Sequence, residues 1–238
     1  LGEIDLRDMM VDSSGNFILY LGGESNSQNF LPLPENANML IVRQTYKNRI
    51  SQTHAKINIK TISSTAAPEL LTPSRLEAQL NQSLAFVKGT ASTFIKWVHE
   101  FKANHKNQLP MGDQAFFQAA GGDPKICYLH GYYDFGEDEY MKITTDIPNC
   151  EYWNFQLENY WMESLDYRHF PIHINESSAI LNKDKTLTIN VSHHYLNIKN
   201  NLITEGRNNG AMLLRWIGAS AHPIPKVEIK KINSMELT

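Results

Sequence analysis

The chain has 238 residues, of which 42% are hydrophobic and 20% charged, with a formal net charge of −3 at pH 7. This length allows one sizeable hydrophobic core or two small ones. The near-neutral charge argues against a nucleic-acid partner, which normally needs a basic face. No apolar run approaches the about 20 residues that cross a bilayer, so we expect a soluble chain without a membrane span.

The first residue is Leu1 rather than methionine, and the sequence starts in mid-pattern with LGEIDLRDMM. We interpret the chain as the C-terminal part of a longer protein. A missing signal peptide therefore carries no information.

Three β-branched and aromatic runs in the opening quarter predict strands, because turn-forming residues separate them. They cover residues 16–21, 38–46 and 55–62. In the third run Ile57 and Ile59 alternate with polar residues, which is typical of a half-buried strand.

A helical period follows and predicts a helical insertion at about 73–104, packed on a β core. Ser74 and Glu77 form a candidate capping box, and Gly89 marks a candidate break. Two apolar stripes define the helix: Leu76, Leu80, Leu84 and Val87, then Phe94, Trp97, Val98 and Phe101.

From Lys125 the chain returns to strands at intervals of about ten to fifteen residues, without helices between them, which favours an antiparallel sheet protein. The expected strands cover 125–135, 139–146, 150–162, 186–193, 211–219 and 226–232. We predict a mainly β, α+β fold: one domain over 1–238, an antiparallel, jelly-roll-like β-sandwich built from 1–62 and 125–238.

Several long blocks are distinctive: GGDPKICYLHGYYDFGEDEYMKI, YWNFQLENYWMESLDYRHFPIHIN, GAMLLRWIGASAHPIP and FLPLPENANMLIVRQTYKNR. They resemble a bacterial family of unknown function, the domain numbered twelve-fourteen, which is often paired with a domain numbered twelve-fifty-four. The resemblance implies a jelly-roll-like sandwich and a preceding segment, but no mechanism. This chain departs from the family pattern at Asn201 and Arg207, where relatives carry Trp and His.

Strands 125–135 and 150–162 each place polar and aromatic side chains on one face, because side chains alternate along a strand. If those faces adjoin, they make a groove suited to a small polar ligand or a sugar. The alternative is an ordinary solvated sheet surface. The candidate ligand-binding residues are Tyr128, His130, Tyr132, Asn154, Gln156 and Arg168.

The stretch YWMESLDYRHFP gathers two carboxylates, an arginine and a histidine. Glu163, Asp166 and His169 are therefore candidate catalytic residues for acid–base chemistry. The alternative is structural: a carboxylate that holds Arg168, with Arg215 needing a similar partner. We favour the structural interpretation.

Metal and cofactor sites are not predicted. His169 and His173 lie about 13 Å apart in an extended chain, and Pro171 disfavours the helix that would bring them together. Cys127 and Cys150 do not form a disulfide framework, and two free thiols are favoured over a bridge.

Three sequons, at Asn81, Asn175 and Asn190, invite a secretory interpretation. Their number matches the about three expected by chance from the Asn, Ser and Thr content. A cytoplasmic location is therefore slightly favoured over secretion.

We thus predict a binding or structural, self-assembling module with a polar-aromatic groove, forming a homo-oligomer or packing on a missing N-terminal segment. One alternative is a hydrolase or lyase that uses Glu163, Asp166 and a histidine. The other is a secreted glycoprotein that self-assembles.

Overall fold

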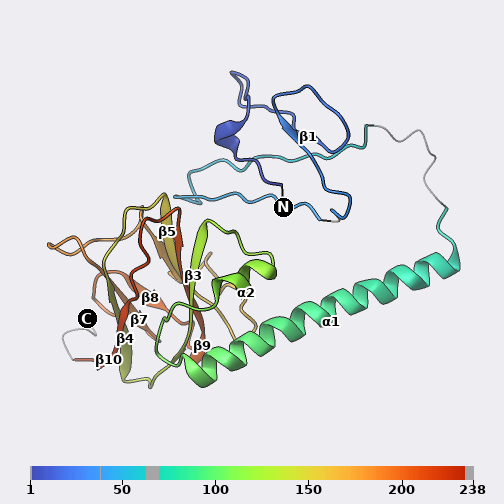
Figure 1. The fold of residues 1–238 in the computed structure, drawn as a ribbon. Coiled ribbons are helices and arrows are strands. Elements are labelled where there is room, and N and C mark those ends of the chain that lie inside the picture. The colour runs from blue at the N-terminus through green and yellow to red at the C-terminus, as the bar shows by residue number, and fades with distance from the viewer. Residues whose placement is uncertain (1, 38, 63–69, 234–238) are drawn as a thin grey trace. The chain divides into compact units, whose positions relative to one another are not determined.

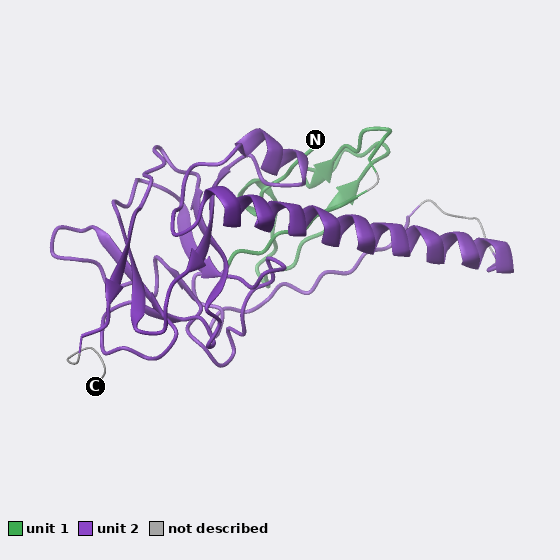
Figure 2. Ribbon diagram, turned by 90° about the horizontal axis from the view of Figure 1, so that it is seen from below, with its two compact units in different colours: residues 1–45 green, residues 46–238 purple. Residues whose placement is uncertain are grey.

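The computed structural model describes residues 2–37, 39–62 and 70–233. Contacts divide the chain into two compact units, residues 1–45 and residues 46–238 (Figure 2). The sequence predicted one domain over 1–238, and this stays a prediction.

The first unit holds little regular structure. It contains a 3-10 turn, η1 (Leu6–Asp8), and two parallel strands, β1 (Tyr20–Leu21) and β2 (Phe30–Leu31). The buried Asn29 side chain accepts a hydrogen bond from the Met10 N–H (2.6 Å) and donates one to the Met10 carbonyl (2.8 Å). Side-chain bonds to the backbone thus supplement a ladder of only two residue pairs.

The prediction of long strands over 16–21, 38–46 and 55–62 is wrong. Only Tyr20–Leu21 is a strand, and the described residues of the other two ranges form none. Ile57 and Ile59 are 43% and 74% exposed. Alternation indicates a strand only where a neighbouring strand satisfies the backbone, and these runs have no such neighbour among the described residues.

The second unit is built on two open, largely antiparallel four-stranded sheets, which confirms the mainly β prediction (Figure 1). One sheet has the order β10-β4-β7-β8 and the other β3-β9-β5-β6, with only β7 and β8 parallel. The strands are β3 (Ile126–Asp134), β4 (Glu139–Thr145), β5 (Tyr152–Leu157), β6 (His173–Asn175), β7 (Leu187–Ser192), β8 (Asn201–Ile203), β9 (Asn209–Ile217) and β10 (Lys226–Lys231).

Both sheets contribute alternate side chains to one core. Trp153 and Phe155 of β5 and Trp216 of β9 are at most 1% exposed, and they join Ile143 of β4 and Val191 of β7. Fully burying a side chain of this size contributes about 1.5–3 kcal/mol to stability. The polar residues between them therefore point to the outer faces.

Trp161 lies in the predicted strand 150–162, on the face that Trp153 and Phe155 share by alternation, but its side chain is 52% exposed. Strand β5 ends at Leu157, and the chain then turns. Asn159 Oδ1 accepts hydrogen bonds from the Trp161 and Glu163 N–H groups, and Met162 has a left-handed φ of 59°. The turn breaks the alternation on which the prediction depended.

The predicted helix is present as α1 (Pro73–Asn104), continuous through Gly89. Its N-cap is Thr72, whose hydroxyl accepts from the Arg75 N–H, so the Ser74 capping box is wrong. Val98 and Phe101, near its C-terminal end, are buried, whereas the first stripe is exposed. A short helix that the sequence did not predict, α2 (Gln114–Ala119), follows with Asp113 as N-cap.

Candidate functional site

The outer face of the β3-β9-β5-β6 sheet gathers the polar side chains predicted for ligand binding. Strand β9 lies between β3 and β5, so Arg215 faces Tyr128 on one side and Asn154 on the other. One step along, Leu213 lies between His130 and Gln156. We call this surface the polar face: Tyr128, His130, Tyr132, Asn154, Gln156, Glu158 and Arg215.

Glu158 enters the polar face just beyond the end of β5. Its backbone N–H donates to the Ala211 carbonyl at 2.9 Å, next to the Tyr132–Ala211 pair of β3 and β9. Gly210 makes this approach feasible, because a Cβ there would lie 2.4 Å from the Glu158 carbonyl oxygen. The side chain is 3% exposed.

Helices α1 and α2 cover the β3 side of the polar face. The His130 ring stacks on Phe101 at 4.9 Å between centroids and meets the Phe117 ring edge-on at 4.7 Å. The Gln114 side chain donates to the Tyr128 carbonyl (2.9 Å) and accepts from the Tyr128 N–H (2.8 Å). These contacts fix β3 and its rings beneath the helices.

The segment after Thr45 covers the β6 side. The Tyr152 hydroxyl donates to the Tyr46 carbonyl (3.4 Å), and Asn175 Nδ2 donates to the Lys47 carbonyl (2.9 Å). The ammonium of Lys47 lies 2.6 Å from a carboxylate oxygen of Glu176. Between the helices on the β3 side and this segment on the β6 side, three residues of the polar face are half-buried: Asn154, Gln156 and Arg215.

Within the part of the chain that the structure describes, five buried side-chain polar atoms have no hydrogen-bond partner, and they lie on or beside the polar face. Nδ1 of His130, Oδ1 of Asn154 and Oε2 of Glu158 belong to it. Trp97 Nε1 lies on a ring 6.2 Å from His130, and His105 Nδ1 on a ring stacked against Phe101. Because most buried polar atoms in proteins are paired, this concentration is unusual.

The charges of the polar face are perturbed. Burial raises the pKa of Glu158 to about 7, against the opposing effect of Arg215. Burial lowers the pKa of His130 to about 3, so its imidazole is neutral at pH 7. Within the described residues Arg215 makes no ion pair, which leaves its guanidinium donors available to an anionic or polar group.

The predicted catalytic residues do not converge. Asp166 is held by Arg168, whose Nε and Nη2 donate to its two carboxylate oxygens at 2.8 Å, and this ion pair lowers the pKa of Asp166 to about 2. Glu163 instead accepts from Asn159 Nδ2 at 2.8 Å. His169 is exposed and bonds to Asp166 through its backbone N–H.

Arg168 lies outside the polar face, on the loop with Asp166, because β5 ends before it. The bond between Arg168 and Asp166 is the brace that the sequence predicted. The companion prediction, that Glu163 or Asp166 binds Arg215, is wrong, since both side chains have other partners. Glu158 is the residue that sequence reasoning left out of the site, although the alternation of Asn154, Gln156 and Glu158 already placed it on this face.

Two of the three sequon asparagines are poor glycan acceptors in the folded protein. Asn175 and Asn190 are 4% and 7% exposed. Asn175 Nδ2 donates to the Lys47 carbonyl, and Asn190 Nδ2 donates to the Lys199 carbonyl (2.8 Å). Asn81 lies on an exposed part of α1.

Cys127 and Cys150 are free, as predicted. Across residues 2–37, 39–62 and 70–233, no three His, Cys, Asp or Glu side chains gather as metal ligands.

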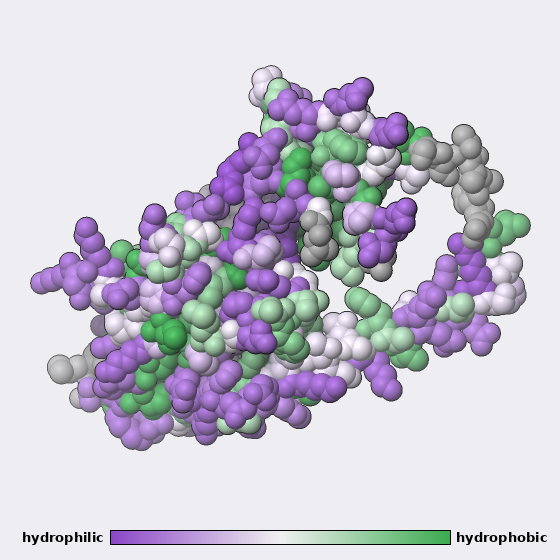
Figure 3. Space-filling view, in the orientation of Figure 1, coloured by the Kyte–Doolittle hydropathy of each residue, from purple (hydrophilic) through white to green (hydrophobic). Residues whose placement is uncertain are grey.

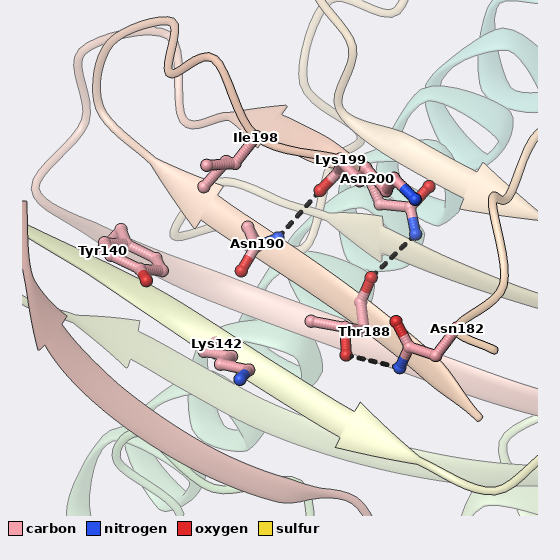
Figure 4. A pocket seen from close by; sticks show the side chains of 8 residues that line it. All are labelled: Tyr140, Lys142, Asn182, Thr188, Asn190, Ile198, Lys199 and Asn200. Carbon is pink, nitrogen blue, oxygen red and sulfur yellow. Dashed lines mark hydrogen bonds between the residues drawn. The ribbon is translucent and has the colours of Figure 1, made fainter. Parts of the chain in front are cut away.

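A shallow, open groove of about 240 Å³ lies on the other sheet (Figure 4). Its amides are already engaged: Asn182 Nδ2 donates to Thr188 Oγ1 (2.9 Å), and Asn200 Nδ2 to the Thr188 carbonyl (2.8 Å). The lining residues are Tyr140, Lys142, Asn182, Thr188, Asn190, Ile198, Lys199 and Asn200. Satisfied amides make this groove a weaker candidate than the polar face.

Comparison with known proteins gives relatives of unknown function. No family model and no curated protein matches the chain. An uncharacterised protein from Burkholderia cenocepacia is 35% identical with a TM-score of 0.90 over 97% of this chain, which spans 64% of that protein's length. The VPA0106 protein from Vibrio parahaemolyticus is 15% identical with a TM-score of 0.38. That match covers 69% of this chain and 47% of the VPA0106 chain. Among the described helices, none is long and apolar enough to cross a bilayer.

Proposed function

We propose that the chain is a binding module that holds a small polar ligand, such as a sugar or a small organic acid, on the polar face. The observation that carries the proposal concerns the described residues only: His130, Asn154 and Glu158 each have an unpartnered buried polar atom on the same face as Arg215, whose guanidinium makes no ion pair. A sugar or an acid offers both donors and acceptors, and Asn154, Gln156 and Arg215 supply their counterparts.

The aromatic rings fit the same ligand class. Tyr128 stacks parallel to His130, with ring planes 7° apart and centroids 6.1 Å apart. Tyr132 is fixed by a hydrogen bond from its hydroxyl to Asn209 Oδ1 (2.6 Å). His130 and Tyr132 are buried and keep this face rigid, whereas the half-buried Tyr128 ring can pack against the apolar edge of a small organic molecule.

Glu158 favours a second candidate, an acid–base enzyme of the hydrolase or lyase type. A carboxyl group with a pKa of about 7 can both release and accept a proton at neutral pH. In this version of the enzyme hypothesis Glu158 replaces Glu163 and Asp166 as the acid–base group. Binding is the first proposal because no nucleophile pairs with Glu158 among the described residues.

As to fold and family, we propose a jelly-roll-like β-sandwich and membership of the twelve-fourteen family of unknown function. The core shared by the two sheets and the quoted sequence blocks support this.

A thermal-shift screen tests the binding proposal. The 238-residue chain is heated with millimolar sugars, sugar acids and small carboxylic acids, beside Arg215→Met and Asn154→Ala. We expect at least one compound to raise the Tm of the wild type and to lose this effect in both variants. The matched control is Lys142→Met, on the other sheet, which should respond like the wild type. A compound that stabilises all variants equally, or no stabilising compound, would overturn the proposal.

A further inference from the structure

Helix α1 carries one continuous apolar stripe, of which only the C-terminal end is covered. Its members recur every three or four residues, so they share one side of the helix. Val98 and Phe101 are 0% and 3% exposed, whereas Leu80 and Leu84 are 61% and 66% exposed. The α1 stripe consists of Leu76, Leu80, Leu84, Val87, Ala91, Phe94, Val98 and Phe101.

The uncovered part is long. Between Pro73 and Ala91 no α1 side chain is buried, although the helix continues without interruption (Figures 1 and 3). In proteins, most of the stability of a helix comes from packing its apolar face against a neighbour rather than from helix propensity. The stripe is therefore the extension of an interface that the protein already uses at Val98 and Phe101.

The flank of the stripe shows which partner fits. Glu77 and Lys88 lie on the same edge of the helix, and within the described residues neither makes an ion pair. In an antiparallel pair of identical helices, residues of the same edge face each other. Centring such a pair between Gln82 and Ser83 places Glu77 of each copy opposite Lys88 of the other.

We propose that the chain forms a two-fold symmetric dimer through the exposed part of the α1 stripe, with a second copy of the chain as its partner. The apolar residues Leu80, Leu84 and Val87 meet across the axis. Two Glu77–Lys88 pairs set the antiparallel register.

The first test measures the molecular mass of the protein in solution. Sedimentation equilibrium of the full chain over roughly a hundredfold range of concentration should give a dimer that dissociates on dilution, with twice the 27.2 kDa of the chain. Leu80→Glu together with Leu84→Glu should give only the monomer. The unfolding transition of the sheets should persist in this variant, because neither residue contacts them. A wild type that stays monomeric at all concentrations would refute the dimer. A different protein that covers the stripe would give this result too, and would equally refute the proposal.

The second test examines the register of the two α1 helices in the dimer by reversing the charges of Glu77 and Lys88. Glu77→Lys alone and Lys88→Glu alone should each weaken dimerisation about tenfold, because each replaces two attractive pairs by two repulsive ones. Mixing these two variants should give a heterodimer with both pairs attractive, and combining both changes in one chain should restore the homodimer. If the mixture dimerises no better than its parts, the register is wrong.

The third test is proximity. In a Cys150→Ser background, Ser83→Cys lies at the axis and should form an intermolecular disulfide on mild oxidation. Ser92→Cys, equally exposed but on the opposite side of α1, is the matched control and should stay reduced. Equal cross-linking of both would show random collision rather than the proposed dimer.

Discussion

Arg215 on β9 lies directly opposite Asn154 on β5, on the outer face of the sheet, with Tyr128 on the other side of Arg215. Arginine on a sheet surface usually meets a carboxylate, but Glu163 and Asp166 are engaged elsewhere. The guanidinium instead faces amides, a neutral histidine and the buried Glu158. This arrangement can accept a polar ligand, which is why the predictions below centre on it.

Glu158 should make stability depend on pH. Its pKa is about 7 in the folded protein, against 4.5 as the ordinary value, so the folded state holds the proton more tightly than the unfolded chain. The stabilisation is complete below about pH 4.5 and is lost as the pH rises through 7, by about 3 kcal/mol. Urea unfolding at pH 5 and pH 8 should show this loss in the wild type and not in Glu158→Gln.

The control for Glu158 is the exposed Glu163. In Glu163→Gln the free energy of unfolding should fall between pH 5 and pH 8 by the same amount as in the wild type. If Glu158→Gln keeps it too, Glu158 is ionised in the folded protein across this range.

His130 should change the pH dependence of stability in the opposite direction to Glu158, lowering the free energy of unfolding as the pH falls. Burial holds its folded pKa at about 3, below the ordinary 6.5, so the unfolded chain gains a proton first as the pH falls. The stabilisation is present above pH 6.5 and declines towards pH 3, by about 3 kcal/mol at pH 4.

His130→Phe keeps the ring stacked on Phe101 and removes the titrating group. Its free energy of unfolding should therefore fall less than that of the wild type between pH 7 and pH 4. His194→Gln, at an exposed position, should behave like the wild type. Parallel curves for all three proteins would contradict the buried, neutral histidine.

Two glycines should respond oppositely to alanine. At Gly131 in β3 a Cβ would lie 1.9 Å from the Gln108 carbonyl oxygen and 2.9 Å from the Met212 side chain. Gly131→Ala should therefore lower the free energy of unfolding by about 2–4 kcal/mol. Gly89→Ala, inside α1 with free space around it, should strengthen the helix by about 0.5–1 kcal/mol. Chemical denaturation checks both, and a destabilising Gly89→Ala would indicate the helix break that the sequence suggested.

The Asp166–Arg168 pair should be structural. Both side chains project from an exposed loop, so Asp166→Asn and Glu163→Gln should leave ligand binding unchanged in the thermal-shift assay. Loss of the ligand response in either variant, with normal folding, would return these carboxylates to the site.

The sequence predicted the sheets better than the segment before them. Strands such as β5, with alternating Trp153, Phe155 and Leu157, have a core to face, and their pattern is unambiguous. The runs 38–46 and 55–62 have equal β character but no neighbouring strand among the described residues. Pairing depends on distant parts of the chain, which composition does not encode locally.

The polar face was predicted in outline and its chemistry was not. Alternation placed Tyr128, His130, Asn154 and Gln156 on outward faces, and the register of β9 brings these faces together. The sequence favoured Glu163 and Asp166 because charges cluster there. The perturbed groups are instead Glu158 and His130, since burial determines their pKa values, and burial follows from tertiary packing.

The most direct measurement of ligand binding is the indole N–H spectrum of the protein labelled with ¹⁵N-tryptophan. The Trp97 ring lies beside His130, and its Nε1 has no hydrogen-bond partner in the described ranges. Trp216 Nε1 donates to the Pro223 carbonyl (3.2 Å) and serves as internal control. Titration with the best compound of the screen should shift the Trp97 signal, leave that of Trp216 in place, and have no effect in Arg215→Met. An unmoved Trp97 signal at saturating ligand, or the same shift in Arg215→Met, would contradict binding at the polar face.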